Sequence, residues 1–523
     1  MSPPVRSITQ RSILAIAAAC ATVLVGSSCD RSITASEQLP PLQAASLDSA
    51  AGGWSMILLS GPTQFTVAAP AAETSAAYAT ELDAIKTAQA HLTATQRRAI
   101  EYWNGGGVLR WNQIARELVA RYNLPPAPRP DGTYPVPDPE NPFADPQFPF
   151  ANPPYAARAY SYLSAAQYDA LKAAWYWKYQ FHRRSPAQVD GAIQALRPVS
   201  DLPAYPSEDA VLSGASAELL KVLFPAAVEE ITQRAAEQRN AALWSGRATA
   251  SDIAAGLALG KSVAGVFVVR AGADGMKNAV GTPAQWQAFA DSAVAHGEIP
   301  WKSLEIPARP PMLPNFGQVQ PWLMTPSDIV AERPPAPPST SSAQMAQEVA
   351  EVRSTVDHLT RDQLAIAYKW NDGAASYTPP GHWNAIAENY VRDARMSEVR
   401  AARSFALLNM AMHNAAVGCW GVKFLYFSPR PEQLDPGIKT VIGLPNFPSY
   451  PSGHSTFSAA AASVMSYLFP AAASDFGAMR DEASISRLYG GIHYRSDIDG
   501  GKVFGIALAG YVVQYAQQDG ADP

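Results

Sequence analysis

The chain has 523 residues, of which 47% are hydrophobic and 16% are charged, and its formal net charge is −5. These values are typical of a globular protein with more than one core, and they exclude a disordered or fibrous chain. The weak negative charge also excludes the basic surface that nucleic acid or an anionic membrane would need. We therefore expect no nucleic-acid partner.

Residues 1–29 are predicted to be an export signal. Arg6 and Arg11 precede an apolar run at 13–25, which small residues follow. Cys29 comes next, so two alternatives stay open: an ordinary cleaved signal, or a lipoprotein signal with Cys29 as the lipid anchor. We expect an exported protein, either periplasmic or tethered to the membrane. Membrane contact is expected through this anchor alone, since no later stretch has the roughly 20 consecutive apolar residues of a membrane span.

Helical patterns dominate the remaining sequence, and few segments alternate with the period of a strand. We expect helices over 76–91, 99–122, 156–179, 210–223, 226–243, 250–269, 343–370, 383–414, 455–468 and 500–516. Two proline-rich stretches, 124–154 and 306–338, cannot continue a helix and are predicted to be extended connectors. The predicted fold class is all-α.

The chain also contains an internal repeat. An offset of 245 residues aligns 156–256 with 401–501 without a gap. The matched pairs include Trp175 and Trp420, Lys178 and Lys423, Ser207 and Ser452, and Asp252 and Asp497. Duplicated units of this kind usually pack around a pseudo-two-fold axis. We therefore predict two related helical bundles, at 76–300 and 343–517, joined by a proline-rich connector at 301–342.

Most polar residues of chemical interest occur in the second copy alone. The pairs that differ are, first copy then second, Ser185 and Arg430, Glu208 and Gly453, Asp209 and His454, Ala242 and Arg487, and Ala248 and His493. The first copy shows that the bundle does not need the second copy's residues in order to fold. Lys423, Ser452 and Asp497 have surviving counterparts, so a structural role stays open for them. The second bundle is predicted to bear the active site.

Three short motifs of the second copy point to one chemistry. They are Lys423-x6-Arg430-Pro431, Pro451-Ser452-Gly453-His454 and Ser486-Arg487-x5-His493-x3-Asp497. Two arginines and a lysine match the charged oxygens of a tetrahedral oxyanion, and a serine hydroxyl and a glycine N–H can complete the cradle. Two histidines can serve as nucleophile or ligand and as acid–base. Asp497 shares a helical face with His493 and can fix its tautomer.

Together these motifs resemble the signature of the type-2 phosphatidic acid phosphatase and vanadium haloperoxidase superfamily. The resemblance implies that phosphate or vanadate is bound by Lys423, Arg430, Ser452, Gly453 and Arg487. It implies that His493 attacks phosphorus or binds vanadium, and that His454 is the acid–base.

Other features resemble the haloperoxidase branch of this superfamily. The duplicated layout is one of them. The resemblance further implies a pocket formed by an acidic residue near the oxyanion-binding arginine and by an apolar lining beside the metal, namely Asp372, Trp420, Pro445 and Phe447. The spacings between the three motifs are short, however, and resemble those of bacterial acid phosphatases.

Three functions stay open at this point. The leading hypothesis is an exported haloperoxidase with vanadate on His493 as its cofactor and with halide and peroxide as its small-molecule substrates. The alternative is an exported phosphatase that needs no cofactor and hydrolyses phosphate monoesters through a phosphohistidine at His493. A non-catalytic scaffold is the third, although the loss of polar residues in one copy alone argues against it. His382 lies outside the motifs, and two roles stay open for it: lining the pocket or, as the favoured alternative, capping a helix near Trp383.

Overall fold

The computed structural model describes residues 38–135 and 149–522, so the predicted export signal and Cys29 lie outside the described residues. Helices are the sole regular element within these two ranges. The prediction of an all-α fold is confirmed. The chain from Leu39 onward forms one compact unit, and a single large hydrophobic cluster takes side chains from both halves.

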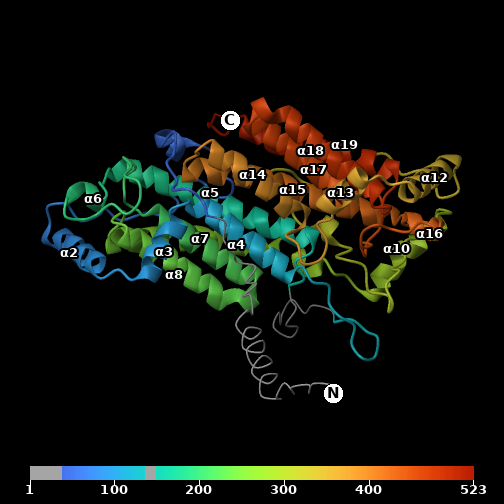
Figure 1. Cartoon of the computed structure of the whole chain (residues 1–523), viewed down its shortest axis with the longest axis horizontal. Helices are drawn as coiled ribbons and strands as arrows, with labels where there is room; N and C mark the ends of the chain where they lie inside the picture. Colours follow the sequence, from blue (N-terminus) through green and yellow to red (C-terminus); the bar gives the residue numbers. More distant parts are fainter. Residues whose placement is uncertain (1–37, 136–148, 523) are drawn as a thin grey trace, which may run out of the picture. The chain divides into compact units, whose positions relative to one another are not determined.

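Two successions of helices follow one another along the chain (Figure 1). The first comprises η1 (Ser49–Gly53), α2 (Ala76–Ala90), α3 (Ala94–Trp103), α4 (Gly107–Tyr122), α5 (Pro153–Phe181), α6 (Pro186–Val189), α7 (Glu208–Leu223), η2 (Pro225–Ala227), α8 (Val228–Trp244), α9 (Ala250–Ala273) and η3 (Met276–Asn278). Between the two lie α10 (Pro283–Ala295), η4 (Phe316–Gln318) and α11 (Pro326–Ala331). The second comprises α12 (Ala343–Asp357), α13 (Arg361–Lys369), α14 (Thr378–Asp393), α15 (Glu398–Tyr426), α16 (Pro431–Leu434), α17 (Gly453–Leu468), η5 (Pro470–Ala472), α18 (Ala473–Tyr489) and α19 (Arg495–Ala516).

The second succession repeats the first. Both ends of α15, α16, α17, η5 and α18 lie 245 residues after the ends of α5, α6, α7, η2 and α8. The residues before α7 and α17 have the same backbone angles, with φ −63° and ψ 120° at Ser207 and φ −64° and ψ 121° at Ser452. Gly246 and Gly491 both take a positive φ, 72° and 74°. This correspondence supports the duplication inferred from the sequence.

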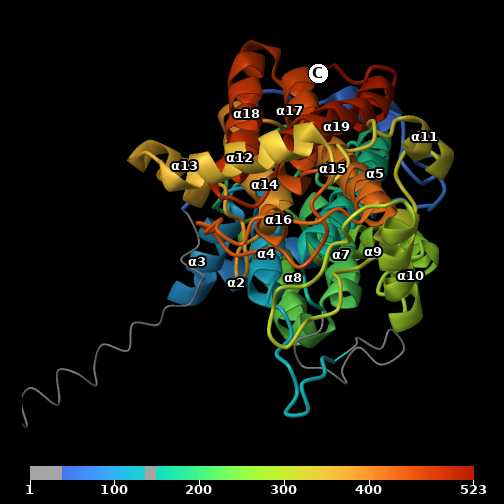
Figure 2. The ribbon, with the colours of Figure 1, turned by 90° about the vertical axis from the view of Figure 1, so that its right-hand side faces the viewer.

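Equivalent residues of the two halves meet in the middle of the protein. The long helices α5 and α15 lie between α17–α19 on one side and α7–α8 on the other (Figure 2). Asn409 Nδ2 donates to Ser164 Oγ at 2.8 Å, and these residues are 245 positions apart. Asn112 Nδ2 of α4 donates to Asn384 Oδ1 of α14 at 2.7 Å. These two asparagines also correspond to each other, since each follows a tryptophan, Trp111 or Trp383. Such self-contacts occur where a two-fold axis passes, so the pseudo-axis runs through this buried amide cluster.

Glycines set how closely the helices of the site approach each other. A Cβ at Gly501 of α19 would lie 2.8 Å from the carbonyl oxygen of Ser452, and a Cβ at Gly505 would overlap the carbonyl of Thr456. The two helices therefore pack backbone to backbone. As a result the N–H of Ser452 donates to the Asp497 carbonyl at 2.9 Å, which joins the second motif to the third.

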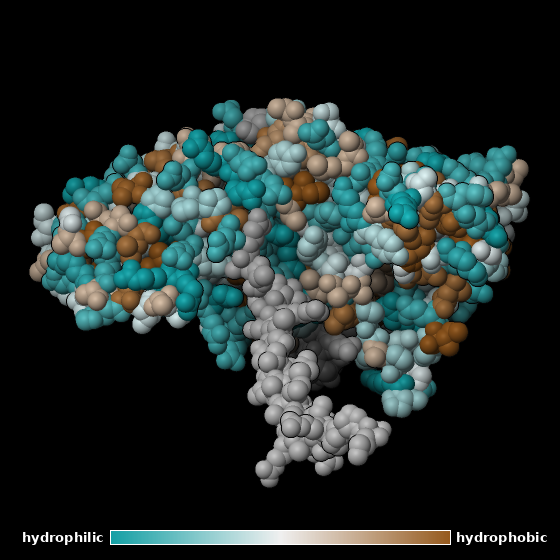
Figure 3. Space-filling view, viewed as in Figure 1, coloured by the Kyte–Doolittle hydropathy of each residue, from teal (hydrophilic) through white to brown (hydrophobic). Residues whose placement is uncertain are grey.

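One helical stretch, Ala250–Asn278, is long and apolar enough in length and composition to cross a membrane. Of its most apolar window, 39% is buried within the protein. Gly256 and Gly260 bring this stretch against α7 in the way that Gly501 and Gly505 bring α19 against α17. On the face shown in Figure 3, hydrophilic and hydrophobic residues are interspersed.

Three predicted helices are each two shorter ones, which corrects the sequence analysis. The stretch at 343–370 is interrupted before Thr360, whose side chain caps α13 together with Gln363. The stretch at 383–414 is interrupted before Ser397, which caps α15. The stretch at 99–122 is interrupted at Gly106, where φ is 105°. Local capping and a left-handed glycine override the continuous apolar pattern at these points.

The amide cluster on the pseudo-axis should stabilise the pairing of the halves. Asn409→Ala leaves buried partners unsatisfied, and we expect the free energy of unfolding to fall by about 1–3 kcal/mol. Denaturant unfolding measures this. Asn389→Ala, on the exposed side of α14, is the control and should change stability by less than about 0.5 kcal/mol. Equal effects of the two substitutions would contradict the structural role of the cluster.

Candidate active site

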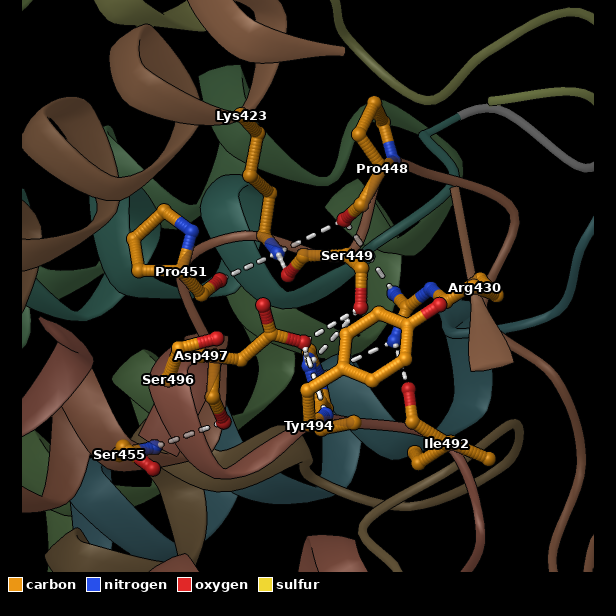
Figure 4. Close-up of polar contacts among 12 residues, drawn as sticks. Lys423, Arg430, Pro448, Ser449, Pro451, Ser455, Ile492, Tyr494, Ser496 and Asp497 are labelled. Atoms are coloured by element: carbon orange, nitrogen blue, oxygen red, sulfur yellow. Dashed lines mark hydrogen bonds and ion pairs between the residues drawn. The ribbon is translucent and has the colours of Figure 1, made fainter. Parts of the chain in front are cut away.

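His493 and Asp497 form a buried pair at the start of α19. Figure 4 shows Asp497 close to Ser449 and Tyr494. His493 Nδ1 lies 2.8 Å from Asp497 Oδ2, the oxygen that also accepts from Ser449 Oγ at 2.5 Å and from the Tyr494 N–H at 3.1 Å. Because a carboxylate accepts, the ring proton belongs on Nδ1 and Nε2 keeps its lone pair. Burial, with the charge of Arg430 next, lowers the pKa of His493 well below its ordinary value. The ring is therefore neutral at pH 7.

The lone pair of His493 faces Arg430. Arg430 Nη1 lies 3.0 Å from His493 Nε2 and also donates to the carbonyl of Ile492 at 2.7 Å. Its Nε and Nη2 donate to the carbonyl of Phe447 at 3.1 and 3.0 Å. Burial lowers the pKa of Arg430 to about 10. An oxyanion beside Nε2 can accept the Nη1 proton that faces His493, while the carbonyl contacts hold the planar guanidinium in place.

Lys423 contributes its positive charge to the site, because its hydrogen-bond donors are already in use. Its Nζ donates to the carbonyls of Pro448, Ser449 and Pro451 at 2.8, 2.8 and 2.6 Å, which uses all three of its protons. Burial lowers the pKa of Lys423 to about 7. The lysine thus shapes the loop before Ser452 and places a positive charge beneath it. Lys423 therefore has the structural role that the sequence left open, and its charge serves the site at the same time.

Arg487 supplies the third cation of the group. Its Nη2 contacts the carbonyl of Trp370, and its Nε donates to Ser486 Oγ at 2.9 Å. Burial lowers the pKa of Arg487 to about 10. Among the residues that the structure describes, no carboxylate forms an ion pair with Lys423, Arg430 or Arg487.

Ser452 and Gly453 begin α17 beside these cations. Ser452 Oγ accepts from the Ser455 N–H at 3.3 Å as the helix cap, and its own hydroxyl proton can still be donated. A Cβ built at Gly453 would meet no atom nearer than 3.9 Å, from Phe457 and Trp420. The first turn of a helix attracts anions, so the space in front of Gly453 is suited to one.

His454 projects from the same turn toward Asp372. His454 Nε2 lies 3.7 Å from Asp372 Oδ2, and it has no hydrogen-bond partner among the described residues. Burial, and then the charge of Arg487, lowers the pKa of His454 well below its ordinary value. A buried ring nitrogen without a partner is rare in a folded protein, and it marks a place for a ligand or a proton to be exchanged.

His382 contacts Asp372, in keeping with the pocket role that the sequence left open beside capping. His382 lies inside α14 and not at its cap, so the favoured capping role is wrong. His382 Nδ1 is 3.1 Å from Asp372 Oδ1, and its ring stacks on Trp370 at 4.4 Å between centroids. Asp372, at a φ of 45°, therefore joins His382 and His454. The sequence signal was the place of His382 ten residues after Asp372 and one before Trp383.

An aromatic wall lies on the side of Lys423 and Arg430. The Phe447 ring is 5.0 Å from Lys423 Nζ, 5.1 Å from the Arg430 guanidinium and 5.0 Å from the Trp420 ring. Trp420 Nε1 donates to the Met312 carbonyl at 3.0 Å, just as its counterpart Trp175 donates to Leu47 at 2.9 Å. The tryptophan therefore has a structural role in both halves. Pro445 is half-buried upstream of Phe447, and none of the site's hydrogen bonds or ring contacts described above involves it.

Residues 404–521 match the model of the PAP2 superfamily, in agreement with the resemblance of the three motifs. Among solved structures, the first bacterial vanadium-dependent iodoperoxidase is similar, with 24% identity and a TM-score of 0.54 over 69% of this chain and 91% of that one. Apo and holo structures of bacterial vanadium-dependent chloroperoxidase match at 14% identity and a TM-score of 0.49, covering 69% and 74% of this chain and 93% and 96% of theirs. The chain shares the iodoperoxidase fold. No curated protein sequence matches it.

The shifted pKa of Lys423 predicts how anion binding depends on pH. A bound anion favours the charged lysine, so binding takes up a proton once the free lysine is neutral. Affinity for sulfate, which stays a dianion throughout, should therefore fall as pH rises above about 7, by at most about tenfold per pH unit for one linked proton. Calorimetric titration across neutral pH measures the slope. Lys423→Met should flatten it, and an unchanged slope in this variant would contradict the assignment.

Proposed function

We propose that this chain is an oxyanion-dependent enzyme of the PAP2 superfamily whose activity is that of a vanadate-dependent haloperoxidase. One observation carries the proposal. The neutral His493 directs a lone pair toward a buried region where Lys423, Arg430 and Arg487 form no ion pair with a carboxylate of the part of the chain that the structure describes. Burying unpaired cations is costly, and a tetrahedral oxyanion compensates that cost with charge and hydrogen bonds together.

The residues of the site fit vanadate. His493 Nε2 would be its protein ligand, with Arg430, Arg487, Ser452 and the Gly453 N–H as hydrogen-bond donors and Lys423 as a further positive charge. Two observations support this fit. A Cβ at Gly453 would meet no atom nearer than 3.9 Å, and His454 Nε2 has no hydrogen-bond partner among the described residues. When bound, vanadate supplies the activation of peroxide that oxidises a halide.

His454 is the acid–base in this proposal. Its low pKa makes the free ring neutral, so it can accept a proton from peroxide entering the site. Asp372 then stabilises the protonated ring from 3.7 Å, and His382 holds Asp372 in place. The aromatic surface of Trp420 and Phe447 limits water near the cations, which strengthens the electrostatic interactions there.

A phosphatase is the second candidate, favoured by the proton that Asp497 holds on His493 Nδ1. In this reaction Nε2 attacks phosphorus, the bond to the leaving alcohol breaks, and the alkoxide takes a proton from His454. Water then attacks the phosphohistidine and gives a proton to His454, which releases phosphate and regenerates neutral His493. Bound phosphate dianion opposes the charge of Arg487 and thereby favours the protonated His454 that the first step needs.

The proposal also includes the cellular location. The predicted export signal at 1–29 would bring the enzyme out of the cytoplasm. Small-molecule substrates outside the cytoplasm would then reach it directly. A lipid on Cys29 would tether it to the membrane. Fractionation of cells expressing the wild-type chain and Cys29→Ala distinguishes the tethered form from the free periplasmic form.

Enzyme assays test the proposal directly. With vanadate and peroxide, the purified protein should halogenate a phenolic dye, and His493→Ala should reduce turnover by about three orders of magnitude or more because the ligand is lost. His358→Ala removes an exposed histidine that contacts its own helix and should leave turnover unchanged. Hydrolysis of an aryl phosphate, inhibited by vanadate and without halogenation, would establish the second candidate instead. If the folded wild-type protein shows neither halogenation nor phosphate hydrolysis, both candidates are contradicted.

Asp497→Asn tests whether Asp497 acts through His493. The substitution keeps the shape but removes the carboxylate charge that stabilises the ring, and we expect turnover to fall about 10- to 100-fold. Asp252→Asn is the matched control. Asp252 is the counterpart of Asp497 and accepts from the Thr249 N–H, but the first half has Ala248 where the second half has His493. Similar losses of stability in both variants, with turnover lost in Asp497→Asn alone, are the expected result. Equal turnover in both variants would contradict the role.

A further inference from the structure

The first half of the chain contains a buried carboxylate at the place where the second half has Gly453. Glu208 is the first residue of α7, as Gly453 is of α17. Its Oε2 lies 2.7 Å from Lys178 Nζ, and its Oε1 accepts from Arg247 Nε and Nη2 at 2.8 and 2.5 Å. Glu208 is 4% exposed. Its neighbours, chiefly Arg247 and Lys178, hold its pKa far below the ordinary range despite burial, so it is ionised.

The surroundings of this carboxylate match the oxyanion site of the second half. Lys178 Nζ donates to the carbonyl of Pro203 at 2.5 Å, and Lys423 Nζ donates to the carbonyl of Pro448, 245 residues later. Ser207 Oγ caps α7 by accepting from the Ala210 N–H, as Ser452 Oγ caps α17. The lysine and the helix start that would hold an oxyanion are therefore present in both halves.

A third cation is also kept, although it comes from another part of the chain. Arg487 contacts the carbonyl of Trp370, and in the first half Arg197 contacts the carbonyl of Trp103. The two tryptophans are equivalent, because their indoles donate to Glu237 and Glu482, which are 245 residues apart. Arg197 Nη1 also donates to Asp209, at the His454 position, at 2.8 Å.

The charges of the two halves then differ in one respect. Lys178, Arg197 and Arg247 surround two ionic partners, Glu208 and Asp209. The three cations of the second half have no such partners among the described residues. We propose that Glu208, with Asp209 beside it, occupies in the first half the place that the oxyanion takes in the second, which implies that this oxyanion carries about two negative charges.

This inference rests on the proposed function in one respect, namely that the site of the second half binds an oxyanion. The packing at Gly453 supports it from the other direction, because a Cβ built there meets no atom nearer than 3.9 Å. A glutamate there can extend toward Lys423, as Glu208 extends toward Lys178. Conversely, Glu208→Gly should leave Lys178 and Arg247 facing an empty site that accepts phosphate. Affinity should be weaker than in the second half, because Asp209 stays.

A set of two reciprocal substitutions tests the proposal by counting bound phosphate per chain in equilibrium dialysis. We expect one bound phosphate per chain for the wild type, none for Gly453→Glu, two for Glu208→Gly and one for the double variant. Glu208→Gln, which fills the same space, is the control and should stay at one. A folded double variant that binds no phosphate overturns the proposal. A wild type that binds none while the double variant binds one contradicts the proposed function but supports this inference.

Gly453→Glu keeps the proposal testable even if Glu208→Gly does not fold. The new carboxylate should pair with the buried cations, so this variant should lose phosphate binding and unfold at a higher temperature than the wild type without phosphate. Simple blockage of the site would lower that temperature. Lost binding with lower thermal stability, or phosphate binding that is unchanged, would overturn the proposal.

Discussion

The structure depends on how it compensates two groups of three positive charges, one at the start of α7 and one at the start of α17. Ionised side chains taken out of water need partners, and the two halves supply them differently. In the first half, carboxylates of the chain itself accept from Lys178, Arg197 and Arg247. In the second half, backbone carbonyls hold Lys423 and Arg430 in position, but no carboxylate among the described residues pairs with them. The missing negative charge is what the proposed ligand provides.

The duplicated fold explains why both halves face this problem. The start of α7 or α17, the loop before it and the following helix α9 or α19 meet through close glycine contacts, so the lysine, the capping serine and the aspartate are fixed together. These residues serve the fold in either half. The residues that differ, Gly453, His454 and His493, are those that need not be kept for packing. Function in this account was added to, or retained on, a scaffold that is stable without it.

Much of this arrangement could be predicted from the sequence. Helical periodicity and the 245-residue offset indicated the fold. Motif spacing placed His493, Asp497, Arg430 and Ser452 together, because each motif includes a helix end. Contacts between segments without a motif could not be predicted. Examples are the orientation of His382 toward Asp372, the use of all three Lys423 protons by carbonyls, and the arrival of Arg197 from a position that Ile442 occupies in the second half. The two-bundle division at 301–342 stays a prediction.

A crystal structure of the wild-type protein soaked with vanadate tests the central claim most directly. We expect one vanadate per chain, with vanadium at bonding distance from His493 Nε2 and its oxygens within hydrogen-bond reach of Arg430, while Glu208 still bridges Lys178 and Arg247 in the first half. Vanadate bound in the first half with Glu208 displaced, or bound in the second half without contact to His493, would contradict that claim.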